Sequence, residues 1–122
     1  MPRITRWEGK EDAGWIFYCP GCQELHQYDK RWTFNGDEAA PTFEPSLKYG
    51  PSWRTPPHWD PDKAPRNEGG SLKTREDGRV IDAIEWTCHL FLRAGKLQFL
   101  DDCSHGLRGQ TVELPELPEW AL

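Results

Sequence analysis

Four cysteines and three histidines fall in three short segments of this 122-residue chain, and their types and spacing predict a zinc site. The candidate ligands are Cys19, Cys22 and His26, then Cys88 and His89, then Cys103 and His105. A tetrahedral zinc site needs only four thiolate or imidazole ligands. The surplus indicates either one site with spare residues or a structural site beside a reactive one.

The segment Cys19-Pro20-Gly21-Cys22 is the clearest of these signals. Two thiolates two residues apart can chelate one zinc from a tight turn, and Gly21 lets the backbone bend there. The strand-like residues 15–18 precede it, which is the strand–knuckle arrangement of a zinc ribbon. A redox C-x-x-C would instead open a helix in an α/β fold, and no such helix is predicted. Zn²⁺ is therefore the expected cofactor.

Strand alternation limits how the other ligands combine. Successive side chains of a strand point to opposite faces, so one metal can take Cys88 or His89 but hardly both. Two ligand sets remain open. In one, the four cysteines close a structural site, and the three imidazoles of His26, His89 and His105 supply a catalytic zinc. In the other, a single zinc takes Cys19 and Cys22 plus two ligands from the remaining segments.

Carboxylates adjacent to these segments are candidates for acid–base chemistry. Glu24 is the candidate general base on zinc-bound water, and Asp102 is expected to orient a histidine or to share the role of base. The three histidines would act as ligands or proton carriers. The Ser46 hydroxyl could bind substrate or stabilise an oxyanion, but a structural role for its Pro-rich segment is the favoured interpretation.

Composition places the chain among small single domains. Its hydrophobic content is 36% and its formal net charge is −5, with a pI near 5.3. An acidic balance argues against nucleic acid, whose phosphates are held by clustered Lys and Arg. No run resembles a signal peptide or a membrane span, so a cytoplasmic protein that acts on or binds other proteins is expected, without membrane contact.

Strand signals outnumber helix signals. No long segment has helical apolar spacing, and eleven prolines interrupt most candidates. Runs of aromatic and β-branched residues predict strands at residues 3–7, 15–18, 31–34, 46–49, 80–92, 96–100 and 110–114. Asn35-Gly36 and Arg93-Ala94-Gly95 are the expected turns. The predicted fold is mainly β: one small antiparallel domain spanning residues 1–122, with a zinc-ribbon-like knuckle and a long Pro-rich loop over about residues 50–78.

The order of the motifs resembles a known family. The blocks are Trp15-x-Phe17-x-Cys19-Pro20-Gly21-Cys22-x-x-x-His26, Trp32-Thr33-Phe34-Asn35-Gly36, Pro41-Thr42-Phe43-x-Pro45-Ser46, Cys88-His89-x-Phe91 and Gln98-Phe99-Leu100-x-Asp102-Cys103-x-His105-x-Leu107-x-Gly109-Gln110-Thr111-Val112. They are similar to a family of small phage and prophage proteins catalogued as a domain of unknown function. Some members carry the label "ammonia monooxygenase", which none of these residues supports.

This resemblance implies a hydrolase in the cytoplasm of a bacterial host. Relatives resemble components found beside bacterial ubiquitin-like conjugation genes, which implies a metal-dependent peptidase. Many relatives have Ser after the Cys-His pair, where this chain has Leu90, so no serine nucleophile is predicted at that position.

Two functions from different classes follow. The first is a zinc hydrolase of peptidase or isopeptidase type that acts on ubiquitin-like conjugates, with zinc activating a water molecule. The second is a non-catalytic protein-binding module with a structural zinc, whose exposed tryptophans in the loop and tail would anchor a partner.

Overall fold

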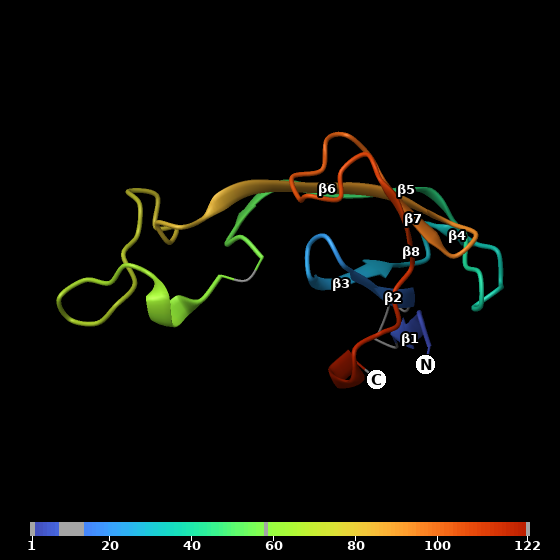
Figure 1. Ribbon diagram of the computed structural model, residues 1–122, viewed down its shortest axis with the longest axis horizontal. Coiled ribbons are helices and arrows are strands. Elements are labelled where there is room, and N and C mark those ends of the chain that lie inside the picture. The colour runs from blue at the N-terminus through green and yellow to red at the C-terminus, as the bar shows by residue number, and fades with distance from the viewer. Residues whose placement is uncertain (1, 8–13, 58, 122) are drawn as a thin grey trace.

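The computed structural model describes residues 2–7, 14–57 and 59–121, and it confirms a mainly β fold of two antiparallel sheets (Figure 1). The strands are β1 (Thr5–Trp7), β2 (Gly14–Cys19), β3 (Glu24–Tyr28), β4 (Thr33–Phe34), β5 (Phe43–Arg54), β6 (Ile84–Arg93), β7 (Lys96–Phe99) and β8 (Thr111–Glu113). Two 3₁₀ turns, η1 (Pro61–Lys63) and η2 (Glu119–Ala121), complete the regular structure of the described residues. No helix among these residues has the length and apolarity required to cross a membrane.

The smaller sheet has the order β1-β2-β3, and the Cys19–Cys22 turn joins its last two strands. Cys19 pairs with Glu24 across this turn, and the Gln23 N–H donates to the Cys19 carbonyl at 2.7 Å. Gln23 closes the turn at a positive φ of 57°. The predicted knuckle is therefore a tight turn between antiparallel strands.

Strand β3 was absent from the sequence prediction. Its residues, Glu-Leu-His-Gln-Tyr, contain few strand formers. In the structure His26 and Tyr28 face the core, where they are 2% and 1% exposed. A strand is recognised in a sequence by the alternation of apolar residues, which face the core, with polar residues, which face solvent. A buried polar residue such as His26 breaks this pattern.

The larger sheet has the order β4-β5-β6-β7-β8. The predicted β6–β7 hairpin is present, and Arg93 pairs with Lys96 around Ala94 and Gly95. Both turn residues have positive φ values, 50° and 76°, as a two-residue turn with the twist of a hairpin requires. Gly36, which follows β4, also has a positive φ of 83°, but Phe34 pairs with Phe43, so residues 35–42 form a longer connection instead of the tight Asn-Gly turn that was predicted.

The core lies between the sheets and is rich in aromatic rings. Tyr28 from β3 stacks on Phe43 from β5, with ring centroids 4.1 Å apart, and Phe43 stacks on Phe34 at 4.7 Å. Leu90, Leu92 and other apolar side chains of β6 and β7 are fully buried below them. The aromatic side chains thus supply much of the buried area that the low aliphatic content cannot.

The loop predicted from residue 50 begins later than expected. Strand β5 continues to Arg54, which pairs with Ile84, because β5 and β6 form a long two-stranded ribbon beyond the other strands. Residues 55–57 and 59–83 then extend from the end of this ribbon, away from both sheets (Figure 1). Trp53 lies under the guanidinium groups of Arg75 and Arg79, at 5.3 and 4.8 Å from its ring centroid.

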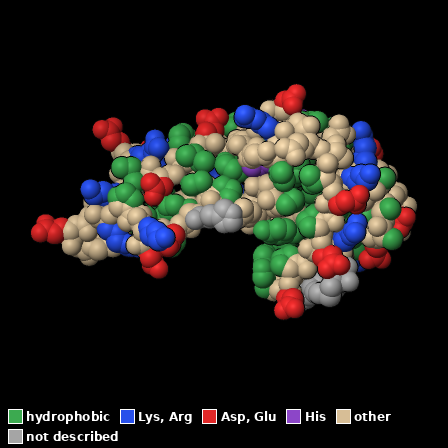
Figure 2. Space-filling view, in the orientation of Figure 1, with side chains coloured by type: hydrophobic (Ala, Val, Ile, Leu, Met, Phe, Trp, Pro, Cys, Tyr) green, Lys and Arg blue, Asp and Glu red, His purple; other side chains and the backbone are tan. Residues whose placement is uncertain are grey.

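Charges of both signs are interspersed over this projecting segment. Figure 2 shows acidic and basic side chains side by side on this face, rather than a continuous basic patch. This distribution agrees with the overall negative charge of the chain. A surface of this kind lacks the clustered cations with which proteins hold nucleic acid backbones.

We expect Gly50→Ala to destabilise the protein more than Gly36→Ala. Both glycines have similar positive φ values, 90° and 83°, so each substitution carries roughly 1–2 kcal/mol of left-handed backbone strain. A Cβ at position 50 would lie 2.3 Å from the Trp86 carbonyl oxygen, whereas position 36 has no atom within 4 Å. Urea unfolding of both variants would measure the difference. Equal losses of unfolding free energy would contradict the close approach of β5 and β6 at Gly50.

Candidate functional site

The outer face of the larger sheet brings a serine, a histidine and an aspartate into one chain of hydrogen bonds. Ser46 Oγ lies 3.1 Å from His89 Nε2, and His89 Nδ1 lies 3.2 Å from Asp102 Oδ2. These residues come from β5, from β6 and from the turn after β7. They are 43 and 13 positions apart along the sequence. The sheet, not the local sequence, creates this arrangement.

The register of β5 and β6 explains why Ser46 reaches His89. Lys48 pairs with His89, so their side chains share a face, and Ser46 lies two residues before Lys48. The pairing shifts between Phe43 and Leu47, where four residues of β5 correspond to two of β6. Irregularities of this kind occur beside active sites, where they redirect a side chain. The Trp32 indole N–H also donates to the Ser46 carbonyl at 3.2 Å and holds this segment in place.

The partners of His89 define its tautomer. A carboxylate oxygen can only accept, so Nδ1 carries the proton and donates it to Asp102. Nε2 of the neutral ring is then free to accept from the Ser46 hydroxyl. This is the protonation pattern in which a histidine can act as a general base on a serine.

Asp102 is held as a carboxylate. Partial desolvation would raise the pKa of Asp102, but the hydrogen bond from His89 and the nearby charge of Lys48 outweigh it and leave this pKa below its usual value. Lys48 Nζ lies 3.7 Å from Asp102 Oδ2. The side chains of His89 and Asp102 are 23% and 46% exposed, so a substrate has access to this face.

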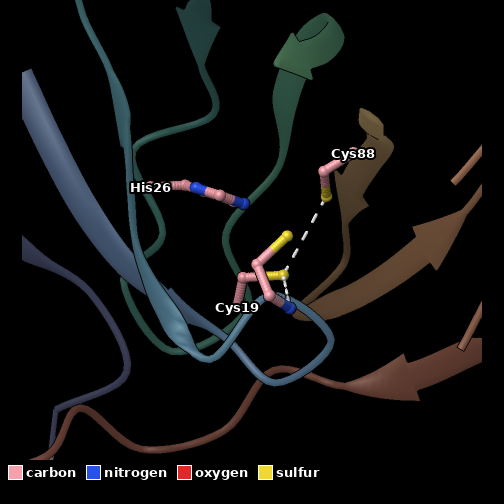
Figure 3. A group of neighbouring side chains, drawn as sticks. Cys19, His26 and Cys88 are labelled. Carbon is pink, nitrogen blue, oxygen red and sulfur yellow. Dashed lines mark hydrogen bonds between the residues drawn. The ribbon is translucent and has the colours of Figure 1, made fainter. Parts of the chain in front are cut away.

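A second group lies on the opposite, buried face of β6. The ligand atoms of Cys19, Cys22, His26 and Cys88 all lie within 4.8 Å of one another, and all four residues are buried. Cys19 Sγ and Cys88 Sγ are 4.0 Å apart. Zn–S bonds of about 2.3 Å at tetrahedral angles place two sulfurs about 3.8 Å apart. Figure 3 shows the His26 ring directed toward the sulfurs of Cys19 and Cys88.

The hydrogen bonding of this group fits a bound metal. His26 Nε2 is buried and has no hydrogen-bond partner among the residues that the structure describes. A metal ligand needs such a free nitrogen. The Trp86 indole N–H donates to Cys22 Sγ at 3.2 Å, and the Cys22 N–H donates to Cys19 Sγ at 3.4 Å. N–H donors of this kind orient ligating sulfurs and offset their charge. The four residues can therefore hold one zinc in a closed Cys₃His site.

The remaining predicted ligands lie beside this group. Cys103 and His105 are grouped with Cys88 and not with Cys19 and Cys22, so the four cysteines do not converge on one point. His105 Nε2 lies 3.6 Å from Cys88 Sγ, and its Nδ1 accepts the Leu107 N–H at 3.2 Å. A neutral His105 ring then carries its proton on Nε2 and donates it to Cys88.

Each other predicted residue has a defined place. His89 belongs to neither metal group, because it faces away from Cys88 as the strand alternation predicted. The three histidines therefore do not surround a common metal. Glu24 forms an ion pair with Arg54 at 2.9 Å, apart from the hydrogen-bonded set of Ser46, His89 and Asp102.

The sequence interpretation underestimated Ser46. Its hydroxyl was considered for substrate binding, but the structural role of the Pro-rich segment was favoured. The signal that could have identified it is the single serine after Pro45 in a block that also carries buried Phe43. Nothing in that block alone indicates that His89 lies opposite.

The fold and the site define a small β protein with a serine–histidine–aspartate arrangement above a buried Cys/His cluster. Residues 3–100 match a family described as the serine protease of a bacterial ubiquitination-like system (BubE). This match covers most of the chain, and the protein belongs to that family. Ser46 and His89 lie inside the matched residues, and Asp102 lies two positions beyond them. Neither the curated proteins nor the solved structures gave a match.

Proposed function

We propose that this protein is a serine hydrolase of peptidase type in which Ser46 is the nucleophile. One observation carries the proposal: the continuous chain from Ser46 Oγ through the His89 ring to Asp102, with distances of 3.1 and 3.2 Å. A nucleophile within hydrogen-bond reach of a base, which a third group orients, is the geometric signature of covalent catalysis. The family description as a serine protease supports the same assignment.

Each residue has a separate role in this mechanism. The Ser46 oxygen attacks the substrate carbonyl while His89 Nε2 accepts its proton. The protonated His89 then gives that proton to the leaving group, which leaves an acyl-enzyme. Water releases the acyl group by the same route in reverse. Asp102 holds the ring in the required tautomer and stabilises its positive charge after proton transfer.

The role of zinc in this proposal is structural. Cys19, Cys22, His26 and Cys88 would hold it, and bound zinc would fix the knuckle of the small sheet against β6. Four protein ligands close a tetrahedral site, whereas catalytic zinc keeps an open position for water. This arrangement favours serine catalysis over the zinc-activated water expected from the sequence, although both mechanisms give a peptidase.

The proposed substrates are conjugates of a ubiquitin-like protein. The family description places its members in a bacterial ubiquitination-like system, so the substrates implied are proteins. We infer that the protein acts in the bacterial cytoplasm as an isopeptidase or as a hydrolase of a related acyl bond. Ser46 and His89 are partly exposed on neighbouring strands, which is consistent with a protein substrate that approaches from the outer face.

A fluorophosphonate probe tests the nucleophile directly. Such probes phosphonylate serines that a histidine activates, and we expect one adduct that peptide mass spectrometry maps to Ser46. His89→Ala should abolish the adduct. Ser52→Ala, which changes another serine of β5, is the matched control and should label like the parent.

Two results would count against this proposal. One is an adduct on a different serine. The other is an unlabelled parent that hydrolyses its substrate and loses this activity with its zinc, which would restore the zinc hydrolase as the better explanation.

A further inference from the structure

The turn after β7 is joined to β6 along the residues that flank the general base. Strand β7 pairs with β6 only from Leu90 to Arg93. Beyond that point, Ser104 N–H donates to the Thr87 carbonyl at 2.8 Å, and Thr87 N–H donates to Ser104 Oγ at 2.9 Å. Residues 100–104 thus continue the pairing that β7 ends.

Within this segment the Cys103 thiol contacts the main chain of His89 at two atoms. The His89 N–H donates to Cys103 Sγ at 3.3 Å, and Cys103 Sγ donates to the His89 carbonyl at 3.1 Å. Cys103 is only 3% exposed, so water cannot replace these bonds. The side chain therefore contacts both polar main-chain atoms of the residue that carries the imidazole, and the His89 carbonyl also accepts the Leu100 N–H at 2.9 Å.

The metal groups leave Cys103 outside the four-residue set. Cys19, Cys22, His26 and Cys88 form that set, whereas Cys103 is grouped only with Cys88 and His105. Its sulfur contacts the main chain of His89 instead.

We propose that Cys103 is a positioning residue for His89, and this rests on the serine hydrolase function proposed above. Asp102, the preceding residue, orients the imidazole ring, while Cys103 fixes the main chain from which that ring projects. Adjacent residues of one turn thus control the direction and the location of the base. A displacement of about 1 Å in a catalytic group can lower a rate by roughly a hundredfold.

Two substitutions separate this role from zinc binding. Cys103→Ala removes both hydrogen bonds, whereas Cys103→Ser keeps a donor and an acceptor at nearly the same place. We expect Cys103→Ala to lower kcat on an activated ester by about ten- to a hundredfold with little change in KM. Fluorophosphonate labelling should slow by a similar factor. Cys103→Ser should recover most of both rates, and both variants should keep the zinc content of the parent.

The outcomes distinguish this inference from the proposed function. A parent that fluorophosphonate does not label overturns both. If the parent is labelled and the Cys103→Ala variant hydrolyses the ester and is labelled as fast as the parent, only the positioning role is overturned. Loss of zinc from either Cys103 variant has the same consequence. Should Cys103→Ala fail to fold, Cys103→Ser and the ¹⁵N spectrum of its histidines decide. Parent-like rates of the Cys103→Ser variant, together with a proton on His89 Nδ1, would support the positioning role of Cys103. A changed His89 tautomer, or rates as low as those expected for Cys103→Ala, would contradict it.

Discussion

Ser46→Ala is expected to reduce kcat by up to about 10⁶-fold, the scale seen when the nucleophile of a serine hydrolase is removed. Ser46 Oγ, 3.1 Å from His89 Nε2, is the only atom of this hydrogen-bonded set that can form the acyl bond. Steady-state hydrolysis of an activated ester, and of a ubiquitin-like conjugate, would measure the loss. Zinc content and thermal stability should stay at the parent level, because Ser46 lies outside both metal groups.

The double variant Ser46→Ala/His89→Ala gives this prediction a second test. Residues that act as a unit have non-additive effects, so removing His89 from the Ser46→Ala variant should cost almost nothing more. Ser52→Ala is again the control on the same strand. Independent, multiplying losses would show that His89 does not act through Ser46, and nearly full activity in Ser46→Ala would refute the serine mechanism itself.

Features that depend on neighbouring residues could be predicted from the sequence. The Cys19–Cys22 knuckle and the Ala94-Gly95 hairpin each follow from the chelating geometry or the conformational freedom of a few adjacent residues. The separation of Cys88 from His89 followed from strand alternation alone, and the structure confirms it. These predictions needed no knowledge of which strands pair.

Features that depend on strand pairing could not be predicted in the same way. Strand β3 was missed because His26, a polar residue, occupies a core position. The start of the projecting segment was misplaced because β5 and β6 support each other through Arg54 and Ile84. The contact of Ser46 with His89 depends on the pairing of β5 with β6, which no local signal in the sequence indicates.

Strand β6 separates two kinds of chemistry that lie side by side in the sequence. Cys88 and His89 are adjacent, yet one faces the buried cluster and the other faces solvent. A surplus of zinc ligands was the reason to expect zinc catalysis. The structure divides that surplus: four residues suit one closed site, His89 contacts Ser46, and Cys103 contacts the main chain of His89. The serine proposal therefore needs no second metal.

Removal of the metal is expected to unfold much of the domain. The four candidate ligands join the β2–β3 turn to β6, so zinc would connect the two sheets through the core. Structural zinc supplies roughly 10–16 kcal/mol in zinc-finger peptides, which is comparable with the roughly 5–15 kcal/mol of total stability of an ordinary domain. A chain with 36% hydrophobic residues has little other stability to retain the fold. Circular dichroism during chelation should show loss of cooperative thermal unfolding, which zinc restores.

Variants of two cysteines make this prediction specific to the Cys₃His set. Cys88→Ser should lose zinc and fold poorly, whereas Cys103→Ser should still bind one zinc per chain. The contrast is informative because Cys88 and Cys103 also lie together in the second group, with His105. X-ray absorption of the parent should report three sulfurs and one nitrogen around the metal. Four sulfurs would instead require Cys103 to displace His26, and a bound water would reopen the possibility of catalysis by zinc. Because Cys88 precedes His89 on β6, loss of the metal should also abolish fluorophosphonate labelling, even though no reaction step uses zinc.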